Sequence, residues 1–519
     1  MNSISLPANT VHECIEAFCR ENPAAHCCTI RVAGQWLSYS RQEFWDHVCR
    51  YADAFANCLA EPTFLLFSKK LDIHLLTAYI GAMKAGHLPA QISFPSAKVN
   101  EAEYHKKIHH IHDITSFGAI FTDATEAGRF ARIGEGMIIT PDILEVPAPP
   151  ASAPAPNRDA LAQFSSGTTG LQKGVILTHQ GIVAHMRSYG DTLQFTPDDA
   201  IVTWLPLYHD MGLIACYLMP LMYGIPFYQI DPFDWIMQPD LLLQVIEQHR
   251  PTICYLPNFA YQVLANKGRV RDLASVRLWI NCSEPARLKS HNGFLDKFPS
   301  VQPETLTVCY ALAENIFAVS QTLPRHNNST RQHESFNALS CGRVIPDTEV
   351  RIFREDGSVE GEIGIKSPFL FDRFIDGSLP LREDYYLTGD LGFVDDRGEL
   401  FVTGRKKDLI IVHGKNIYPQ DVEYAASEVD GVYPGRSVTF GIWDDEIGTE
   451  ELYVLVERKE GAAPTPIKIA VQKAVNEEIG IVPKRVEVVE HMTLVKTSSG
   501  KISRSRNREL YMNKGLALL

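Results

Sequence analysis

Residues 164–175, Phe-Ser-Ser-Gly-Thr-Thr-Gly-Leu-Gln-Lys-Gly-Val, combine the residue types that bind a polyphosphate. Glycine lets the backbone turn tightly and approach a ligand closely. Backbone N–H groups and hydroxyls in such a turn form an anion cradle, and a lysine adds a point charge. The predicted phosphate-binding residues are Ser165, Ser166, Gly167, Thr168, Thr169, Gly170 and Lys173.

The spacing within this stretch is that of neither the Walker A loop nor the dinucleotide fingerprint. A plain flexible loop of the same composition is the alternative interpretation. The flanking segments favour a cradle, because residues 158–164 can end in a short strand and residues 175–179 are strand-like. An amphipathic helix is expected from there to about Tyr189.

Length and composition limit the possible classes of protein. A chain of 519 residues is too long for one hydrophobic core. The net charge of −13 argues against a general nucleic-acid binder. We expect no transmembrane helix and no secretory signal. The eleven scattered cysteines contain no C-x-x-C pair, which predicts reduced thiols in a cytoplasmic protein.

The elements that must position the loop alternate between strand and helix. Ser40 and Glu43 have the spacing of a capping box that opens a helix to about Cys58. Strand patterns at residues 64–67 and 88–92 flank a helical pattern at 71–86, and the rhythm returns at 241–256. This alternation predicts an α/β fold with parallel strands and crossover helices.

The composition changes after Gly404, where the charged residues 405–408 separate two apolar runs. Strands are expected at 438–442 and 452–457, and helices from about Pro419 and at 467–479. We therefore expect a large N-terminal domain at 1–404 with packed mixed and parallel sheets, a hinge at 405–408, and a small mobile α+β domain at 409–519. A solvated hairpin turn is the alternative for 405–408. The Pro- and Ala-rich residues 147–156 are interpreted as a surface connector.

Further segments, in the same order along the chain, resemble motifs of the adenylate-forming superfamily. That superfamily includes acyl-CoA synthetases, fatty acyl-AMP ligases, luciferases and peptide-synthetase adenylation domains. The segments are Trp-Leu-Pro-Leu-Tyr-His-Asp-Met-Gly-Leu at 204–213, Asn-Cys-Ser-Glu-Pro at 281–285, Tyr-Ala-Leu-Ala-Glu-Asn at 310–315, Tyr-Leu-Thr-Gly-Asp at 386–390, Gly-Arg at 404–405 and Thr-Ser-Ser-Gly-Lys-Ile-Ser-Arg at 497–504. Together with 164–175 they span most of the chain, although Gln172 stands where the family usually has proline.

The resemblance implies an ATP site built from these motifs. Ser283, Glu284 and Pro285 would face adenine. Tyr310, followed by Ala311, would stack on it. The sites implied for ribose, phosphate and metal are Asp390 for the ribose hydroxyls, Arg405 for ribose and phosphate, and Glu314 for Mg²⁺.

The resemblance also implies how the reaction is organised. His209 would stand between the carboxylate pocket and the ATP pocket. Lys501 would be the mobile catalytic lysine, and Lys407 would be the hinge residue about which the small domain takes two orientations.

The implied chemistry activates a carboxylate, which is a poor electrophile. Attack on the α-phosphate of ATP gives an acyl-adenylate and pyrophosphate. The protein must position two anions and neutralise the charge that develops at phosphorus. A thiol, from CoA or from the phosphopantetheine of a carrier protein, then attacks the mixed anhydride and AMP leaves.

Segments 257–261, 408–411 and 416–421 resemble fatty acyl-AMP ligases and related acyl-CoA ligases. An apolar acyl pocket is predicted from Met211, Tyr255, Leu256 and Phe259, although plain core is equally expected there. The insertion that disfavours CoA in acyl-AMP ligases is not seen between Tyr310 and Asp390, which leaves an acyl-CoA ligase open.

Two alternatives remain open at this point. An amino-acid or aryl-acid adenylating enzyme is the first, and an amino-acid enzyme would need a pocket carboxylate, for which Asp234 is the candidate. The second is a non-catalytic binding protein on the same scaffold, which intact Lys501, Glu314 and Asp390 disfavour.

Overall fold

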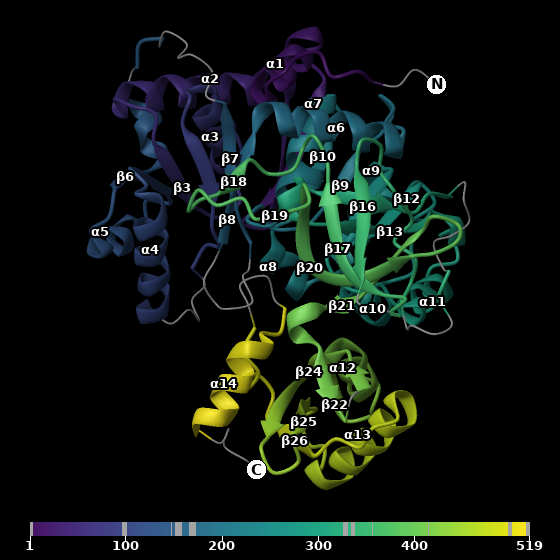
Figure 1. Cartoon of the computed structure of the whole chain (residues 1–519). Helices are drawn as coiled ribbons and strands as arrows, with labels where there is room; N and C mark the ends of the chain where they lie inside the picture. The colour runs from purple at the N-terminus through teal and green to yellow at the C-terminus, as the bar shows by residue number, and fades with distance from the viewer. Residues whose placement is uncertain are drawn as a thin grey trace.

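The structure is a computed structural model that describes residues 4–95, 101–146, 148–150, 158–165, 173–324, 331–333, 338–354, 357–413, 415–496 and 501–514. Predicted site residues 166–170, most of the connector 147–156 and residues 497–500 lie outside these ranges. So do the side chains of Ser165 and Lys173. Figure 1 shows a large body of sheets and helices above a smaller one. We call residues 4–405 the large lobe and residues 409–514 the small lobe.

The widest sheet of the large lobe has nine strands in the order β15-β14-β13-β12-β11-β9-β10-β1-β2. Its central strands are parallel, and β2, β14 and β15 run antiparallel to their neighbours. The strands are β1 His26–Val32, β2 Gln35–Ser40, β9 Ile201–Thr203, β10 Phe227–Gln229, β11 Ile253–Leu256, β12 Leu278–Asn281, β13 Leu306–Ala311, β14 Ala318–Gln321 and β15 Arg343–Val344.

A second sheet has seven strands in the order β18-β8-β7-β4-β3-β5-β6. Five of them are parallel, while β8 and β18 are antiparallel to their neighbours. The strands are β3 Phe64–Ser68, β4 Leu88–Gln91, β5 Ala119–Thr122, β6 Met137–Ile139, β7 Asp159–Ser165, β8 Lys173–Thr178 and β18 Arg373–Phe374. The third sheet is antiparallel and comprises β16 Glu349–Arg354, β17 Gly361–Lys366, β19 Leu381–Arg382, β20 Tyr385–Val394 and β21 Leu400–Arg405.

Helices connect the parallel strands, as the sequence predicted. The capping box at Ser40 and Glu43 is present and opens α2. Helix α3 packs closely on α2, since a Cβ added to Gly81 would lie 2.7 Å from the Cβ of Tyr51. The helices of the large lobe are α1 Val11–Glu21, α2 Arg41–Cys58, α3 Ile73–Lys84, α4 Glu101–Thr115, α5 Ala127–Ile133, α6 His179–Leu193, α7 Met219–Tyr223, α8 Pro232–Met237, α9 Asp240–His249, α10 Asn258–Lys267 and α11 Leu288–Lys297. Among the helices that the structure describes, none has both the length and the apolar composition to span a bilayer.

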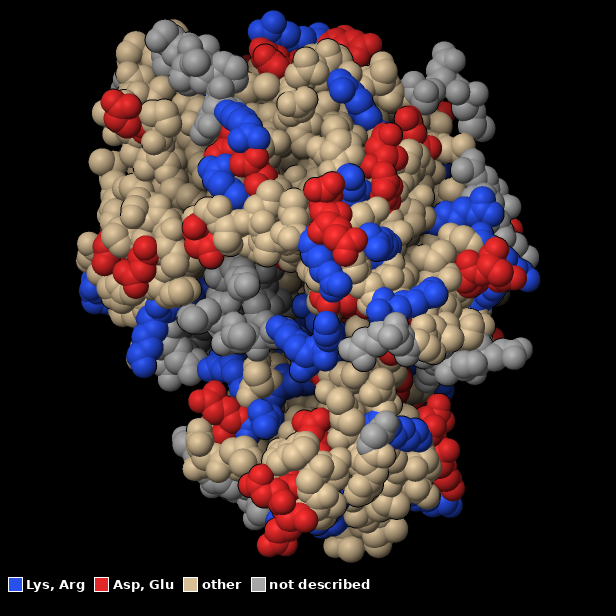
Figure 2. Space-filling view, viewed as in Figure 1, with Lys and Arg blue, Asp and Glu red and all other residues tan. Residues whose placement is uncertain are grey.

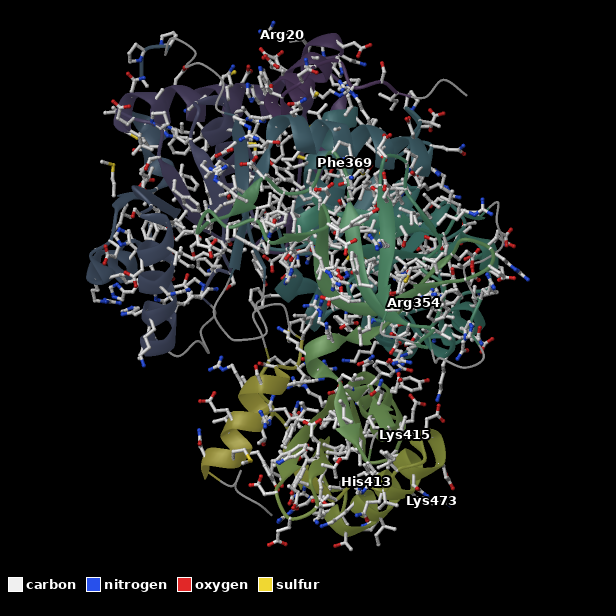
Figure 3. The ribbon with its side chains drawn as sticks, viewed as in Figure 1. Arg20, Arg354, Phe369, His413, Lys415 and Lys473 are labelled. Atoms are coloured by element: carbon white, nitrogen blue, oxygen red, sulfur yellow. The ribbon has the colours of Figure 1, made fainter. Side chains whose placement is uncertain are left out.

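The small lobe has its own core, to which residues such as Ile410, Val422, Val454 and Val471 contribute and which shares no residue with the large-lobe core. Its elements are β22 Ile410–Val412, β23 Lys415–Ile417, α12 Pro419–Ser427, β24 Val432–Asp444, β25 Thr449–Arg458, α13 Pro464–Ile479, β26 Arg485–Val489 and α14 Arg504–Lys514. In Figure 3, His413, Lys415 and Lys473 mark this lobe, whereas Phe369 lies in the large lobe. A short 3-10 helix, η6 Lys406–Asp408, joins the lobes. The domain boundaries proposed from the sequence stay a prediction.

Candidate active site

A carboxylate cluster lies where three strands of the large lobe come together. Asp390 on β20 is opposite Arg405 in the β20–β21 ladder, and Arg405 Nε lies 2.8 Å from Asp390 Oδ1. The hydroxyl of Tyr310 on β13 donates to Asp390 Oδ2 at 2.6 Å. Burial raises the pKa of Asp390, and Arg405 opposes that shift. Both carboxylate oxygens are oriented from the protein side and keep lone pairs for a ligand.

Glu314 lies on a strained turn beside this cluster, in the 3-10 helix η4 Ala313–Asn315. Ile316 has a φ of 65°, an unusual conformation for a β-branched residue that costs about 1–3 kcal/mol. The backbone N–H of Phe371 donates to the Glu314 carbonyl at 2.7 Å, and Tyr386 OH donates to Glu314 Oε1 at 3.2 Å. Burial raises the pKa of Glu314. The surrounding contacts therefore fix this carboxylate, and no cationic side chain among the described residues forms an ion pair with it.

His209 lies at the entrance of an element that the sequence did not predict, the π-helix η2 Met211–Leu218. π-Helical turns occur frequently at functional sites. A Cβ on Gly212 would lie 2.2 Å from the carbonyl oxygen of Pro206, so this position requires glycine. Burial lowers the pKa of His209 to about 3, with a smaller contribution from Lys501. Among the described residues, His209 Nε2 is buried without a hydrogen-bond partner.

Lys501 enters the site from the small lobe. Its Nζ donates to the carbonyl oxygen of Ser283 at 2.6 Å, across the junction between the lobes. Ser283 has a φ of 71°, a left-handed backbone conformation that is uncommon for a residue other than glycine. The charge of Lys501 acts on the pKa of His209, Asp210 and Asp390. The lysine thus completes a group of predicted residues that come from both lobes.

The turn that carries Ser283 differs in one respect from the expectation that it faces adenine. Glu284 Oε2 accepts a hydrogen bond from the backbone N–H of Phe259 at 3.1 Å, in the first turn of α10. A carboxylate at a helix N-terminus is stabilised by the free N–H groups and the helix dipole. The Glu284 side chain therefore tethers the turn to α10. Pro285 follows in the same turn, and Ala311 ends β13.

The predicted phosphate loop is held by a β-hairpin. Strands β7 and β8 are antiparallel, and Ser165 pairs with Lys173 at their ends, so residues 166–172 connect them. The strand-like segments expected on either side of the predicted loop are therefore present as β7 and β8. Gly174 has a packing reason to be glycine, because an added Cβ would lie 2.1 Å from Ile375 Cδ1.

A basic cavity of about 400 Å³ lies between the carboxylate cluster and the predicted hinge. It is lined by Thr388, Gly389, Arg405, Lys406 and Lys407. Lys and Arg side chains gather at the junction of the two lobes in Figure 2. Lys406 Nζ is paired with Glu362 Oε2 at 2.8 Å. The cavity thus places positive charge next to the predicted ribose site, where phosphates or an anionic acceptor can enter.

The predicted acyl pocket stays a prediction, and the contacts of its residues place Tyr255 apart from Met211 and Phe259. Met211 Sδ lies 3.8 Å from Ser283 Oγ, and Phe259 packs edge-on against the stacked rings of Trp204 and Trp235. Tyr255 and Leu256 are consecutive on β11, so their side chains point to opposite faces of the sheet.

Tyr255 contacts elements on one face of that sheet. Its hydroxyl donates to Tyr189 OH at 3.2 Å, and its ring packs against Phe317. Met211 and Phe259 therefore border the Ser283–Glu284 turn, while Tyr255 belongs to the packing against α6.

Asp234, the candidate for holding an amino group, is already engaged. Its Oδ2 lies 3.0 Å from Arg31 Nε, and it lies in the short helix α8 with its side chain about one-third exposed. An ammonium substrate would have to compete with this guanidinium.

Sequence reasoning missed several polar residues that shape the site. Tyr386 was part of a quoted motif, but its bond to Glu314 depends on the pairing of β20. Arg504 follows Lys501 by three residues and bonds to both Asp408 and Glu423. Like Tyr386, Arg504 belongs to a quoted motif, but its two carboxylate partners are distant in the sequence.

Comparisons with known proteins agree with this geometry. The profile of the AMP-binding enzymes matches residues 15–374. The chain belongs to this family of AMP-binding enzymes. It is 30% identical to the medium-chain fatty acid–[acyl-carrier-protein] ligase JamA of Moorena producens, over 69% of this chain and 68% of that protein. The chain is thus an adenylate-forming enzyme of the ligase class, and such enzymes use ATP.

Solved structures share the fold over both lobes. A structure of McyG A-PCP complexed with phenylalanyl-adenylate superposes with a TM-score of 0.88 at 21% identity, covering 99% of this chain and 85% of that one. A structure from studies of fatty acyl-adenylate ligases from E. coli and L. pneumophila gives a TM-score of 0.86 at 22% identity, covering 100% of each chain. The mixed α/β, two-domain architecture expected from the sequence is confirmed.

Proposed function

We propose that this enzyme joins an apolar, fatty-acyl-type carboxylic acid to AMP and then transfers the acyl group to a thiol. The observation that carries the proposal is the convergence of Lys501 from the small lobe with Asp390, Arg405, Glu314 and His209 of the large lobe. The similarity to a medium-chain fatty acid ligase supports the class of acid.

In this proposal the carboxylate cluster of Asp390, Tyr310 and Arg405 binds the nucleoside. The two ribose hydroxyls donate to Asp390, whose oxygens Tyr310 and Arg405 hold in place at 2.6 and 2.8 Å. Arg405 also offers positive charge to the α-phosphate from the wall of the basic cavity. Because these groups are oriented before ATP arrives, little reorganisation accompanies binding.

The residues present fit a bound Mg²⁺. The described residues contain no group of three or more His, Cys, Asp or Glu side chains placed to hold a metal. Mg²⁺ is usually held by one or two carboxylates together with substrate phosphates and waters. Glu314 is such a carboxylate, and its raised pKa shows that nearby positive charge does not compensate its burial. Bound there, the ion would neutralise phosphate charge.

Lys501 and His209 act on the reacting groups. The Lys501 ammonium lies where it can bridge the substrate carboxylate and the α-phosphate, which brings two anions together. His209 stays neutral at physiological pH because its pKa is about 3. It therefore offers a hydrogen-bonding nitrogen to the carboxylate pocket without a charge.

The acyl acceptor is CoA or the phosphopantetheine of a carrier protein. The similarity to an acyl-carrier-protein ligase supports a carrier, while the ordinary spacing between Tyr310 and Asp390 supports CoA as well. The apolar side chains of Met211, Phe259 and Trp204 border the site and suit an acyl chain.

The test is ATP–pyrophosphate exchange with a panel of acids, namely fatty acids of six to sixteen carbons, benzoate derivatives and amino acids. We expect exchange with one or more fatty acids. Exchange with amino acids alone would overturn the assignment. Thioester formation is then measured with CoA and with a phosphopantetheinylated carrier protein, which identifies the acceptor.

A further inference from the structure

The small lobe contacts one short segment of the large lobe, residues 283–289, at three points. Ser283 accepts from Lys501, Arg287 pairs with Asp421, and Lys289 pairs with Glu428. Residues 283–285 form the turn of the candidate active site. One continuous segment thus carries both the candidate site and three contacts with the other lobe. Further contacts near the start of α12 join it to other parts of the large lobe, since Gln420 Nε2 donates to the Thr403 carbonyl at 2.6 Å and Tyr418 OH donates to Glu360.

Arg287 makes the most extensive of these contacts. Its Nη2 donates to Asp421 Oδ1 at 2.7 Å and to the Gln420 carbonyl at 3.4 Å, and its Cζ lies 5.1 Å from the ring centroid of Tyr424. The side chain is 7% exposed. All three partners belong to the first two turns of α12. Planar guanidinium groups suit such combined ion-pair and stacking contacts.

On the other side of α12, a second arginine connects the helix to the Lys501 loop. Arg504, three residues after Lys501, bonds to Glu423 of α12 at 2.7 and 2.8 Å. It also bonds to Asp408 of η6 at 2.9 Å. Arg504 therefore connects the residues that follow Lys501 to α12 within the small lobe.

These contacts form a closed path from Arg287 through α12 and Arg504 to Lys501 and back to Ser283. We infer that Arg287 is a positioning residue for adenylate formation: its grip on Asp421 and Tyr424 holds α12 so that Lys501 reaches the Ser283 turn. Arg287 does not itself touch the reacting groups. Thioester formation does not require Lys501 in the site under the proposed function, so it does not require the contacts of Arg287 with α12.

The first test compares half-reactions and rests on the proposed function. In Arg287→Ala, the rate of ATP–pyrophosphate exchange falls roughly tenfold to a hundredfold, as expected for loss of a charged hydrogen-bonded contact. Thioester formation from supplied acyl-adenylate stays within about threefold of wild type. Asp421→Asn has the same selective effect, and the double variant is little worse than either single one. Arg287→Lys regains part of the exchange rate.

The matched control is Arg271→Ala. Arg271 is as well bonded, with Asp240 and Glu247 each at 2.7 Å, but all three residues lie within the large lobe. Its loss changes stability without separating the two half-reactions. An equal fall of both half-reactions in Arg287→Ala, or the same selective fall in Arg271→Ala, would overturn the inference.

A second test does not depend on activity. Lys289 and Glu428 are in contact at the exposed edge of the same interface. With cysteines at both positions, a short bis-maleimide cross-links the lobes in the wild-type background. We expect slower cross-linking when Arg287→Ala is added and no change when Arg271→Ala is added, with single-cysteine variants as blanks. Unchanged cross-linking in Arg287→Ala contradicts the positioning role. If no acid supports exchange in the wild type, the proposed function fails while this measurement still tests the interface.

Discussion

Two parts of the candidate site are built in different ways. We call Asp390, Tyr310 and Arg405 of the large lobe the fixed half, and Lys501 of the small lobe the docked half. Asp390 and Arg405 lie on the paired strands β20 and β21 and form an ion pair, and Tyr310 on β13 donates a short hydrogen bond to Asp390. Lys501 is exposed, on a loop of the other lobe, and bonds to a single carbonyl. The first half exists whenever the large lobe is folded, and the second exists only when the small lobe is docked.

This difference separates binding from chemistry. In the proposed function, a carboxylate that is oriented before ATP arrives lowers the cost of binding ATP. In the same proposal, a lysine supplied by the small lobe neutralises charge at phosphorus only while that lobe is docked. Substitutions in the two halves should therefore change different kinetic quantities.

The largest expected effect belongs to the docked half. Lys501→Ala should lower the adenylation rate roughly 10²- to 10³-fold, because one preorganised charge contact is lost in the transition state. Thioester formation from supplied acyl-adenylate should be preserved. Pyrophosphate exchange measures the first step, and a near-normal exchange rate would remove Lys501 from it.

The fixed half should respond mainly in binding. Asp390→Ala removes the acceptor that we propose for the two ribose hydroxyls, and each charged hydrogen bond is worth about 1.5–3 kcal/mol. The apparent KM for ATP should rise at least tenfold while the protein stays folded. Steady-state exchange at varied ATP, with circular dichroism as the folding control, checks this. An unchanged KM would place the ribose site elsewhere.

The sequence predicted the fixed half better than the docked half, for physical reasons. Asp390 and Arg405 were predicted from short local motifs, and the pairing of β20 with β21 brings the two side chains together. The capping box at Ser40 was found because its partners are three residues apart. The pair Arg287–Asp421 spans 134 positions and depends on lobe docking, which leaves no local pattern. Tyr255 was assigned to the acyl pocket because sequence does not say which face of β11 packs against α6.

The predicted hinge at residues 405–408 connects the halves, and its conformation allows a sharper test. Lys407 lies within the 3-10 helix η6, where φ is typically about −50 to −70°. Proline fixes φ near −65°, so Lys407→Pro fits the observed docked state, apart from a modest conflict with the residue before it. We expect adenylation within about threefold of wild type and at least tenfold slower thioester formation.

Both half-reactions are measured on the Lys407→Pro variant, with CoA and with a carrier protein as acceptors. Lys407→Ala serves as the control for loss of the side chain. If both half-reactions fall equally, or neither falls, Lys407 is not the pivot.

The smallest effect concerns the fixed half alone. His185 on α6 is fully buried in the large lobe. Its Nε2 bonds at 3.2 Å to the carbonyl of Ala318, which lies on β14, the strand that follows the Glu314 turn. Burial lowers the pKa of His185 to about 4, so the unfolded state, with a pKa near 6.5, takes up the proton first. Stability is therefore full above about pH 6.5 and is lost as the pH falls towards 4, by about 1.4 kcal/mol per pH unit for one histidine.

The variant His185→Gln lacks this titrating group, so its free energy of unfolding should depend less on pH between about 6.5 and 4. The buried carboxylates with raised pKa act in the opposite direction, but they are the same in both proteins and cancel in the difference. Urea unfolding of wild type and variant at pH 7, 6, 5 and 4 measures it. We expect the variant to be less stable at pH 7 and to lose less stability on acidification. Parallel curves at all four pH values would show that His185 does not contribute to the acid sensitivity of the fixed half.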